Sequence, residues 1–410
     1  MVVHTNYKLV GSKIDNIMSE ARMSVALERV KRGWKTIEPR KGRVAAADAS
    51  RGVKKLENFY VFGVRAAGRS PKRYIVAEYL DVLPLPEKGE DFSRFIMEAV
   101  EAKTLSVLAN DAEVLLFDGS MSAVPSLVPV FPSGKFVSTY RSKKELIDNY
   151  LLFFTASLMD DYVEFRKRML SDGFTFEHVV RSLSIEYHPG DYVGDAPNYN
   201  EIEKLHDEIV NLIIGKSASS LARDVLALLI YVEYVWSAEQ LFRNYYKVVG
   251  FAKSGYRRYI LGEGGGMLTD NLIVRSTVIE KKLRTPGYVE VWHWLDKTAV
   301  PEYLKDIFNL LGFSVFLAID EQDENVFPHR LYYLHSKVTP VYYVESFTDP
   351  NKVMPLVESI VDSSGYPIVL KMVHNDSVIT FDEFENSLMV LKNYTRNPVL
   401  AFVFGRDPLL

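Results

Sequence analysis

The feature that most constrains this chain is a run of small apolar residues, Arg43-Val-Ala-Ala-Ala-Asp-Ala-Ser-Arg-Gly52, which carries one carboxylate near its end. Val44 and the three alanines that follow it, set between two glycines, predict a strand that is packed on both faces. An unpaired charge in such a strand would cost several kcal/mol. Another group must therefore hold Asp48 in its ionised form.

A second stretch, residues 113–120, repeats this design: a hydrophobic strand, then Asp118, then small residues and a turn. The apolar spacing over residues 92–109 predicts a helix that leads into this strand. Because such crossovers are right-handed, we expect the 113–118 strand to lie parallel to the 44–49 strand. The two aspartates would then be neighbours at one edge of a sheet, and this pairing predicts a divalent-metal site.

The predicted fold class is α/β, with a ribonuclease-H-like mixed sheet core and a helical insertion. Short connections at residues 50–55 and 68–72 predict that strands 44–49, 57–67 and 73–83 form an antiparallel meander. The other expected helices are residues 12–32, 142–171 (opened by a capping box, Ser142-x-x-Glu145), 217–242, a helix beginning at Pro301, 350–362, 367–374 and 381–393. The other expected strands are residues 245–252, 313–319, 330–334 and 338–347, and the expected irregular segments are 125–134 and 184–200.

No linker or repeat divides the chain, so we expect a single domain over residues 1–410. Its expected parts are an N-terminal helix (1–35), the first half of the sheet core with the acidic site (36–135), a helical insertion (140–243) and the second half of the core (244–410).

Composition narrows the chemistry. The chain has no cysteine, which excludes disulfides, thiolate zinc sites and cysteine nucleophiles. Net charge is −4, so a nucleic acid would have to meet local basic patches. We expect a cytoplasmic protein without a membrane partner, because no signal peptide or membrane span is evident. Only two glutamines accompany abundant charged residues, a pattern that suggests a thermophile.

Further carboxylates lie between the two aspartates. The helix over residues 92–109 carries Glu98 and Glu101 on one face, and the third strand carries Glu78. A single such acid is most often a solvated surface residue. The order strand–Asp, hairpin, helix–Glu, strand–Asp is how ribonuclease-H-like folds present acids to two Mg²⁺ or Mn²⁺ ions for phosphodiester hydrolysis.

Three later segments carry groups of interest. Lys253, Arg257 and Arg258 form either an ordinary basic turn or a phosphate clamp. The glycine-rich residues 262–266 lack the ending of a phosphate-binding P-loop, so we expect no ATP hydrolysis by this chain itself. His374 closes an apolar segment; it could be structural, ligate a metal or move a proton.

These pieces together resemble the NurA family of archaeal nucleases. The matching segments are Ala-Asp-Ala-Ser around Asp48, Leu-Phe-Asp-Gly-Ser around Asp118, the acid-bearing helix, Lys253-Ser254, and Gly365-Tyr-Pro followed by His374. The resemblance implies a ribonuclease-H-like core and Mn²⁺-dependent action on DNA, including 5′-to-3′ degradation of single strands. It also implies a ring-shaped homodimer and a hexameric DNA-translocating ATPase, HerA, as its partner in resecting double-strand breaks.

The leading hypothesis is therefore a metal-dependent DNA nuclease, a 5′-to-3′ single-strand exonuclease and endonuclease. Asp48 and Asp118 would be metal ligands. Glu101 is the preferred third ligand because it lies nearer the second strand; Glu98 competes for that role, and Glu78 is a possible supporting ligand.

Lys253 would hold the scissile phosphate, and His374 would assist at the second metal or donate a proton. The DNA substrate would be single strands and duplex ends.

One alternative is a non-catalytic or weakly active NurA-like subunit that tethers DNA and regulates the motor. The first motif reads Asp-Ala-Ser where Asp-Gly-Ser is usual, and Val373 replaces a usual alanine, as a divergent paralogue would show. A nuclease of the same fold acting on RNA or on DNA structures is a further rival. The apolar run 399–404 is a candidate motor-binding segment, although a core strand is the simpler reading.

Overall fold

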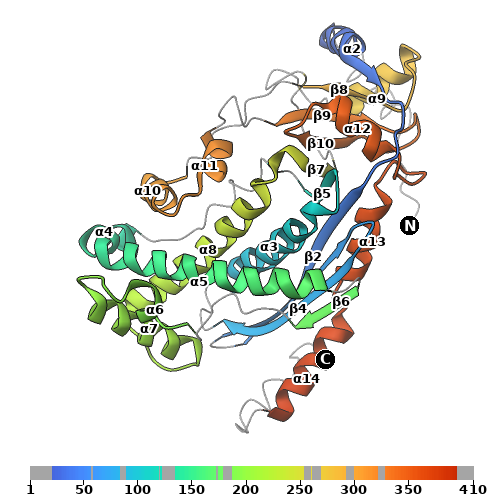
Figure 1. The fold of residues 1–410 in the computed structure, drawn as a ribbon. Coiled ribbons are helices and arrows are strands. Elements are labelled where there is room, and N and C mark those ends of the chain that lie inside the picture. Colours follow the sequence, from blue (N-terminus) through green and yellow to red (C-terminus); the bar gives the residue numbers. More distant parts are fainter. Residues whose placement is uncertain are drawn as a thin grey trace, which may run out of the picture.

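The structure is a computed structural model that describes residues 21–56, 59–83, 89–119, 121, 134–171, 174–178, 187–253, 260, 269–291, 300–321 and 328–394. Within these residues, one mixed sheet of ten strands organises the fold in the order β1-β8-β9-β10-β7-β5-β2-β3-β4-β6 (Figure 1). The strands are β1 Trp34–Thr36, β2 Val44–Lys55, β3 Tyr60–Arg69, β4 Tyr74–Leu83, β5 Val114–Asp118, β6 Phe174–His178, β7 Val248–Lys253, β8 Gly287–Glu290, β9 His329–Leu334 and β10 Tyr342–Ser346. The predicted α/β class with a mixed sheet is confirmed.

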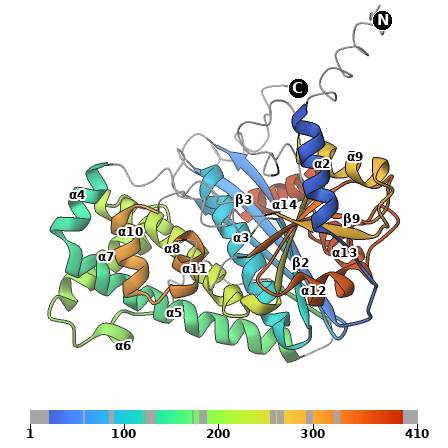
Figure 2. The same cartoon turned by 90° about the horizontal axis from the view of Figure 1, so that it is seen from above.

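Helices cover both faces of the sheet. The α-helices are α2 Ala21–Gly33, α3 Gly89–Val107, α4 Gly134–Ser142, α5 Lys144–Ser171, α6 Gly190–Val193, α7 Tyr199–Ile213, α8 Ser220–Phe242, α9 Asp270–Glu280, α10 Glu302–Leu310, α11 Ser314–Glu321, α12 Pro350–Glu358, α13 Ile368–Ser377 and α14 Phe381–Tyr394. Ala45 and Ala47 of β2 face the large core built on α3, α5 and α8. Ala46 faces the opposite core, under α12 and α13. Figure 2 shows these two helical layers on either side of the sheet.

Small residues allow α3 to lie close to the centre of the sheet. A Cβ added to Gly68 on β3 would lie 2.7 Å from the side chain of Thr104 on α3. The three alanines of β2 at positions 45–47 are fully buried between the two cores. The close approach of α3 brings its acidic residues to the strand that carries Asp48, because a glycine or alanine surface leaves room for a helix backbone.

The central connections follow the predicted topology. Strand β2 pairs antiparallel with β3, β3 pairs antiparallel with β4, and β2 pairs parallel with β5. One detail is wrong: residues 50–55, predicted as a turn, continue strand β2 to Lys55. The strand continues because β3 runs alongside it as far as Tyr60, so each of these residues has a partner across the ladder.

The predicted strand over residues 313–319 is wrong, because Ser314–Glu321 forms helix α11. Its buried side chains, Phe313, Phe316 and Leu317, follow helical spacing and pack in the core around α8. The carboxylate of Glu239 on α8 accepts hydrogen bonds from the backbone N–H groups of Val315 and Phe316 and so caps the first turn. Short apolar runs do not distinguish a helix from a buried strand by periodicity alone.

Three other local predictions also need correction. Ser142 does not cap α5; its hydroxyl donates to the carbonyl of Thr139 inside α4. Residues 190–193 and 199–213 form α6 and α7, where part of an irregular segment was expected. Strand β6 lies within the predicted helical insertion, yet it joins the edge of the sheet beside β4.

Helix α8 is the one helix among the described residues that is long and apolar enough to cross a membrane. Its most apolar window has a mean hydropathy of 1.3 and is completely buried by neighbouring elements. A central core helix has this composition as well, because it meets apolar neighbours all round.

Candidate metal centre

The two aspartates lie side by side at the ends of adjacent parallel strands. Ala47 of β2 is directly opposite Phe117 of β5, so the next residues, Asp48 and Asp118, occupy equivalent positions. Strand β5 ends at Asp118, whereas β2 continues. The carboxylate of Asp48 is largely buried, and Asp118 is exposed at the strand end. The predicted neighbourhood of the two acids is confirmed.

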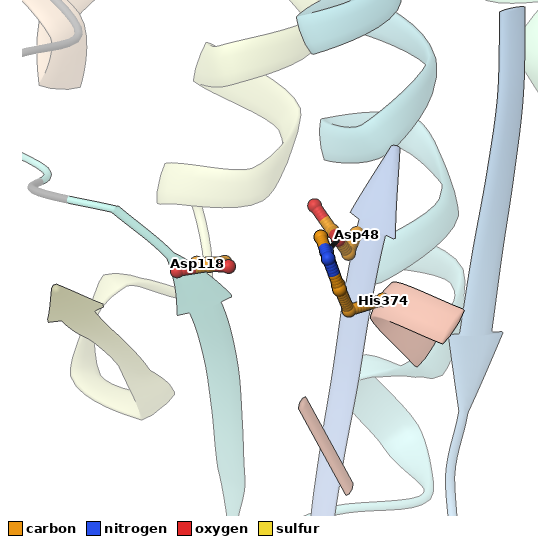
Figure 3. Close-up of side chains that lie close together, drawn as sticks. All are labelled: Asp48, Asp118 and His374. Atoms are coloured by element: carbon orange, nitrogen blue, oxygen red, sulfur yellow. Dashed lines mark hydrogen bonds and ion pairs between the residues drawn. The ribbon is translucent and has the colours of Figure 1, made fainter. Parts of the chain in front are cut away.

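His374 completes a cluster with the two aspartates. It comes from α13, and its Nδ1 lies 2.7 Å from Oδ2 of Asp48. Ligand atoms from Asp48, Asp118 and His374 all lie within 4.8 Å of one another. Figure 3 shows the three side chains, with Asp48 and Asp118 on separate strands and His374 beside Asp48. Two carboxylates and an imidazole form an oxygen-rich donor set of the kind that suits Mn²⁺.

Glu101 is outside the group of ligand atoms that lie within 4.8 Å of one another, but it is close enough to interact with the charges of both aspartates. It lies on α3, its carboxylate is buried, and its Oε1 has no hydrogen-bond partner among the described residues. Burial raises the pKa of Glu101 well above its usual range, and the negative charges of Asp48, Glu98 and Asp118 raise it further. An orphaned carboxylate oxygen beside two aspartates is what a cation-binding centre requires, because a bound cation would satisfy it. The residues therefore fit a divalent metal ion.

Glu98 is engaged elsewhere. Its carboxylate accepts a 2.8 Å hydrogen bond from Nε of Arg94 and a further one from Tyr234. Burial raises its pKa, and these partners favour the ionised form. Glu98 therefore has partners of its own, whereas the buried carboxyl group of Glu101 has one oxygen without a hydrogen-bond partner among the described residues.

Glu78 does not reach the cluster. It lies on β4, two strands away from β2, and its carboxylate forms a 2.5 Å ion pair with Nε of Arg65 on β3. Arg65 stands opposite Glu78 in the β3–β4 ladder, so the two charges meet directly across the strands. The structure does not support the prediction that Glu78 is a supporting ligand.

Tyr366 is a residue at this centre that the sequence reasoning did not single out as a site residue. Its hydroxyl donates a hydrogen bond to Asp118, and burial together with the charge of Asp118 raises the pKa of Tyr366. Its ring packs against Phe251 of β7 and Tyr342 of β10. The signal available in the sequence was the Gly365-Tyr-Pro motif eight positions before His374.

A tight turn fixes the position of Tyr366. The carboxylate of Asp362 accepts hydrogen bonds from the side chain and backbone of Ser364, from Nζ of Lys371 and from the backbone of Tyr366, and these lower the pKa of Asp362 to about 2. Gly365 has a φ of +82°, and a Cβ there would lie 2.5 Å from Cβ of His335. Glycine is required at this position both by its backbone conformation and by the close contact.

The basic segment is described only in part. Lys253 is the last residue of β7, opposite Tyr342 of β10, and β7 lies next to β5. The backbone of Lys253 is therefore on the strand that neighbours Asp118. Arg257, Arg258, the glycine-rich residues 262–266 and the apolar run 399–404 lie outside the described residues.

Sequence comparison identifies relatives of the whole chain. The family described as NurA domain matches residues 42–379, a range that includes both aspartates, Glu101, Tyr366 and His374. The chain is also 21% identical over 384 residues to the uncharacterized protein MJECL07 of Methanocaldococcus jannaschii, covering 90% of this chain and 88% of that protein.

Solved structures share the fold over nearly the full length. A crystal structure of NurA superposes with a TM-score of 0.70 at 18% identity, covering 97% of this chain and 98% of that chain. NurA bound to dAMP and manganese gives a TM-score of 0.68 at 17% identity, with 98% and 100% coverage. The NurA nuclease from Sulfolobus solfataricus gives 0.55 at 12% identity, with 96% and 97% coverage.

Proposed function

This chain belongs to the NurA family, and on that premise we propose that it is a divalent-metal-dependent deoxyribonuclease. The observation that carries the proposal is the convergence of Asp48, Asp118 and His374 within 4.8 Å, with the unpaired carboxylate oxygen of Glu101 behind them. A metal bound at such a site would favour hydrolysis of a phosphodiester, since negative charge develops on the phosphate oxygens in the transition state.

The metal is Mn²⁺ or Mg²⁺, and we propose two ions, held by Asp48, Asp118 and Glu101 with His374. The solved structure of NurA bound to dAMP and manganese supports this choice of metal and of a deoxyribonucleotide ligand. When bound, metal ions would activate the attacking water and stabilise the leaving oxygen.

The residues of the chain have distinct roles around this centre. Asp48 orients the imidazole of His374 through Nδ1, which leaves Nε2 of the half-exposed ring directed away from that contact. Tyr366 holds the carboxylate of Asp118 by a hydrogen bond. Lys253 would hold the scissile phosphate, and His374 would assist at the second ion or donate a proton to the leaving group.

We further propose that the enzyme degrades single strands in the 5′-to-3′ direction, also cleaves internally, and resects double-strand break ends as a homodimer with a HerA-type hexameric ATPase. Family membership supports this assignment. The sequence supports a separate motor as well, because it contains no P-loop motif and duplex DNA must be unwound and moved for processive degradation.

The test is a nuclease assay on single-stranded DNA labelled at either the 5′ or the 3′ end, with Mn²⁺ or with EDTA. We expect cleavage with Mn²⁺ and none with EDTA. Early release of a labelled mononucleotide from the 5′ end would establish the 5′-to-3′ direction. Absence of cleavage with Mn²⁺ and Mg²⁺, alone and with the ATPase, would contradict the enzymatic proposal.

A further inference from the structure

One face of strand β2 contacts the C-terminal helices in sequence order. Alternate residues of a strand share a face, so positions 48, 50, 52 and 54 point toward the same layer. Asp48 contacts His374 at 2.7 Å, and Oγ of Ser50 accepts the backbone N–H of Ile379 at 2.9 Å. Lys54 forms a 3.0 Å ion pair with Glu385. The strand that carries the first metal ligand therefore also sets the register of the segment that carries His374.

The remaining position on this face, Gly52, packs against the aromatic ring of Phe384. Gly52 is paired with Gly63 across the β2–β3 ladder, and Phe384 of α14 lies over both. A Cβ added to Gly52 would lie 2.7 Å from the Phe384 ring, and one added to Gly63 would lie 3.4 Å from it. Phe384 is 6% exposed and packs with Leu56, Val61 and Leu388. Two facing glycines in a ladder weaken the strands, and here they make room for this ring.

The segment between Phe384 and His374 is closely hydrogen-bonded. The backbone N–H of Val378 donates to the carbonyl of His374 at 3.2 Å, at the end of α13. Thr380 and Glu383 form a reciprocal capping box at the start of α14, with bonds of 2.9 and 3.2 Å. The connection is therefore short and fixed, and a displacement of α14 would move the end of α13.

Polar contacts at Ser377 also tie the end of α13 to β2: Oγ of Ser50 donates to the carbonyl of Ser377, and Oγ of the buried Ser377 donates to Oδ2 of Asp48 at 3.4 Å. Leu370 and Val373 hold the helix on the sheet by apolar packing, which is non-directional. Asp376 forms a 2.8 Å ion pair with Arg69, but both side chains are partly exposed, so solvent screens the pair. The side chain of His374 is itself 58% exposed and is little restrained by packing.

We propose that Phe384, seated between Gly52 and Gly63, is a positioning residue that fixes His374 against Asp48. The expected effect on catalysis rests on the proposed function. The position of the His374 imidazole, in contrast, can be measured in a protein without nuclease activity. We therefore expect that removing the ring of Phe384 displaces His374. Removing the ring of Phe381, which is exposed on the same helix α14, should leave His374 in place.

The test compares Phe384→Ala with Phe381→Ala, because Phe381 lies on the same helix and is 73% exposed. Protein labelled with ¹⁵N-histidine is studied without metal, and His374→Gln identifies the His374 signal among the eight histidines. We expect Phe384→Ala to shift or broaden the Nδ1 resonance of His374. It should also lower kcat about 100-fold with little change in KM. Phe384→Leu should restore part of the His374 signal and part of kcat. Phe381→Ala should match the wild type in both measurements.

A second pair of variants keeps the test independent of the stability of Phe384→Ala. Gly52→Ala should displace the ring and reproduce the His374 shift, whereas Gly63→Ala, which makes only ordinary contact, should not. A wild-type His374 resonance in both Phe384→Ala and Gly52→Ala would overturn the proposal. If the wild-type protein lacked nuclease activity, the proposed function would fail while the resonances would still decide the positioning role.

Discussion

Nδ1 of His374 lies 2.7 Å from Oδ2 of Asp48, although 326 positions of the chain separate the two residues. The contact joins β2, at the centre of the sheet, to α13, near the end of the chain. The metal centre is therefore complete only after the C-terminal helices have packed on the sheet. Single substitutions can test the role of each residue in this centre.

Asp48→Asn and Asp118→Asn should each abolish cleavage, because each removes a charged ligand from the centre while preserving the size of the side chain. We expect turnover to fall at least about 1,000-fold, while DNA binding and melting temperature stay close to the wild type. Glu113→Gln is the matched control. Glu113 is exposed and directly precedes β5, whereas Asp118 is the last residue of that strand. Wild-type cleavage by either aspartate variant would refute the assignment.

Glu101→Gln and Glu98→Gln should differ in severity. Glu101 has an unpaired buried oxygen and interacts with the charges of both aspartates, so its substitution should weaken Mn²⁺ binding and lower turnover about 100-fold or more. Glu98 is paired with Arg94, so Glu98→Gln should retain most activity. Calorimetric titration with Mn²⁺ and initial cleavage rates, measured in parallel, decide between them. The assignment is reversed if only Glu98→Gln is inactive.

Tyr366→Phe should impair catalysis without unfolding the protein. The ring contacts with Phe251 and Tyr342 remain, whereas the hydrogen bond to Asp118 is lost. We expect a roughly 10-fold loss of turnover, as for removal of one hydrogen bond to a charged group. Thermal melting and steady-state kinetics on the same preparation separate the two effects. A loss confined to stability would show that Tyr366 is only a packing residue.

Glu233 should make stability depend on pH. It is buried on α8, where its carboxylate pairs with Lys103 of α3, and burial raises its pKa from 4.5 to about 7. The folded state then holds this proton more tightly than the unfolded chain. The resulting stabilisation is present below pH 4.5 and is lost as the pH rises through about 7.

Urea unfolding at pH 4.5 and 7.5 measures this dependence. Between these pH values the wild type should lose about 3 kcal/mol more of its free energy of unfolding than Glu233→Gln, which cannot titrate. The two proteins are compared by how much their free energy of unfolding changes between the two pH values. The absolute values differ for another reason as well, because Glu233→Gln leaves Lys103 without its carboxylate partner. Identical pH dependence of the two proteins would contradict the assignment.

Light scattering should detect the proposed assembly. We expect a dimer at micromolar concentration, and a larger complex after addition of a HerA-type hexamer. DNA binding should weaken steeply with salt, because a chain with a net charge of −4 must concentrate its cations where the polyanion binds. A monomer that does not bind the hexamer would contradict both partner proposals, whatever its nuclease activity.

The residue pattern along the chain predicts the centre of the fold. Alternating and continuous apolar patterns, with the handedness of the crossover helix, placed Asp48 and Asp118 on adjacent parallel strands, and the structure confirms this pairing. These features are set by neighbours along the chain and by topological rules that hold for most proteins. The same information predicted a helix over residues 92–109 that carries Glu98 and Glu101, and the structure has α3 there.

The other side chains around the aspartates come from elements that meet in the folded protein, and the sequence pattern did not determine which they are. The rotation of α3 turns Glu101 toward the strand ends and leaves Glu98 with Arg94. Across the sheet, Arg65 engages Glu78, and a distant turn brings Tyr366 to Asp118. Helix rotation and cross-strand partners depend on packing between segments far apart in sequence, and local periodicity does not encode them. The packing of Phe384 on Gly52 and Gly63 depends in the same way on β2, β3 and α14, which meet only in the folded protein.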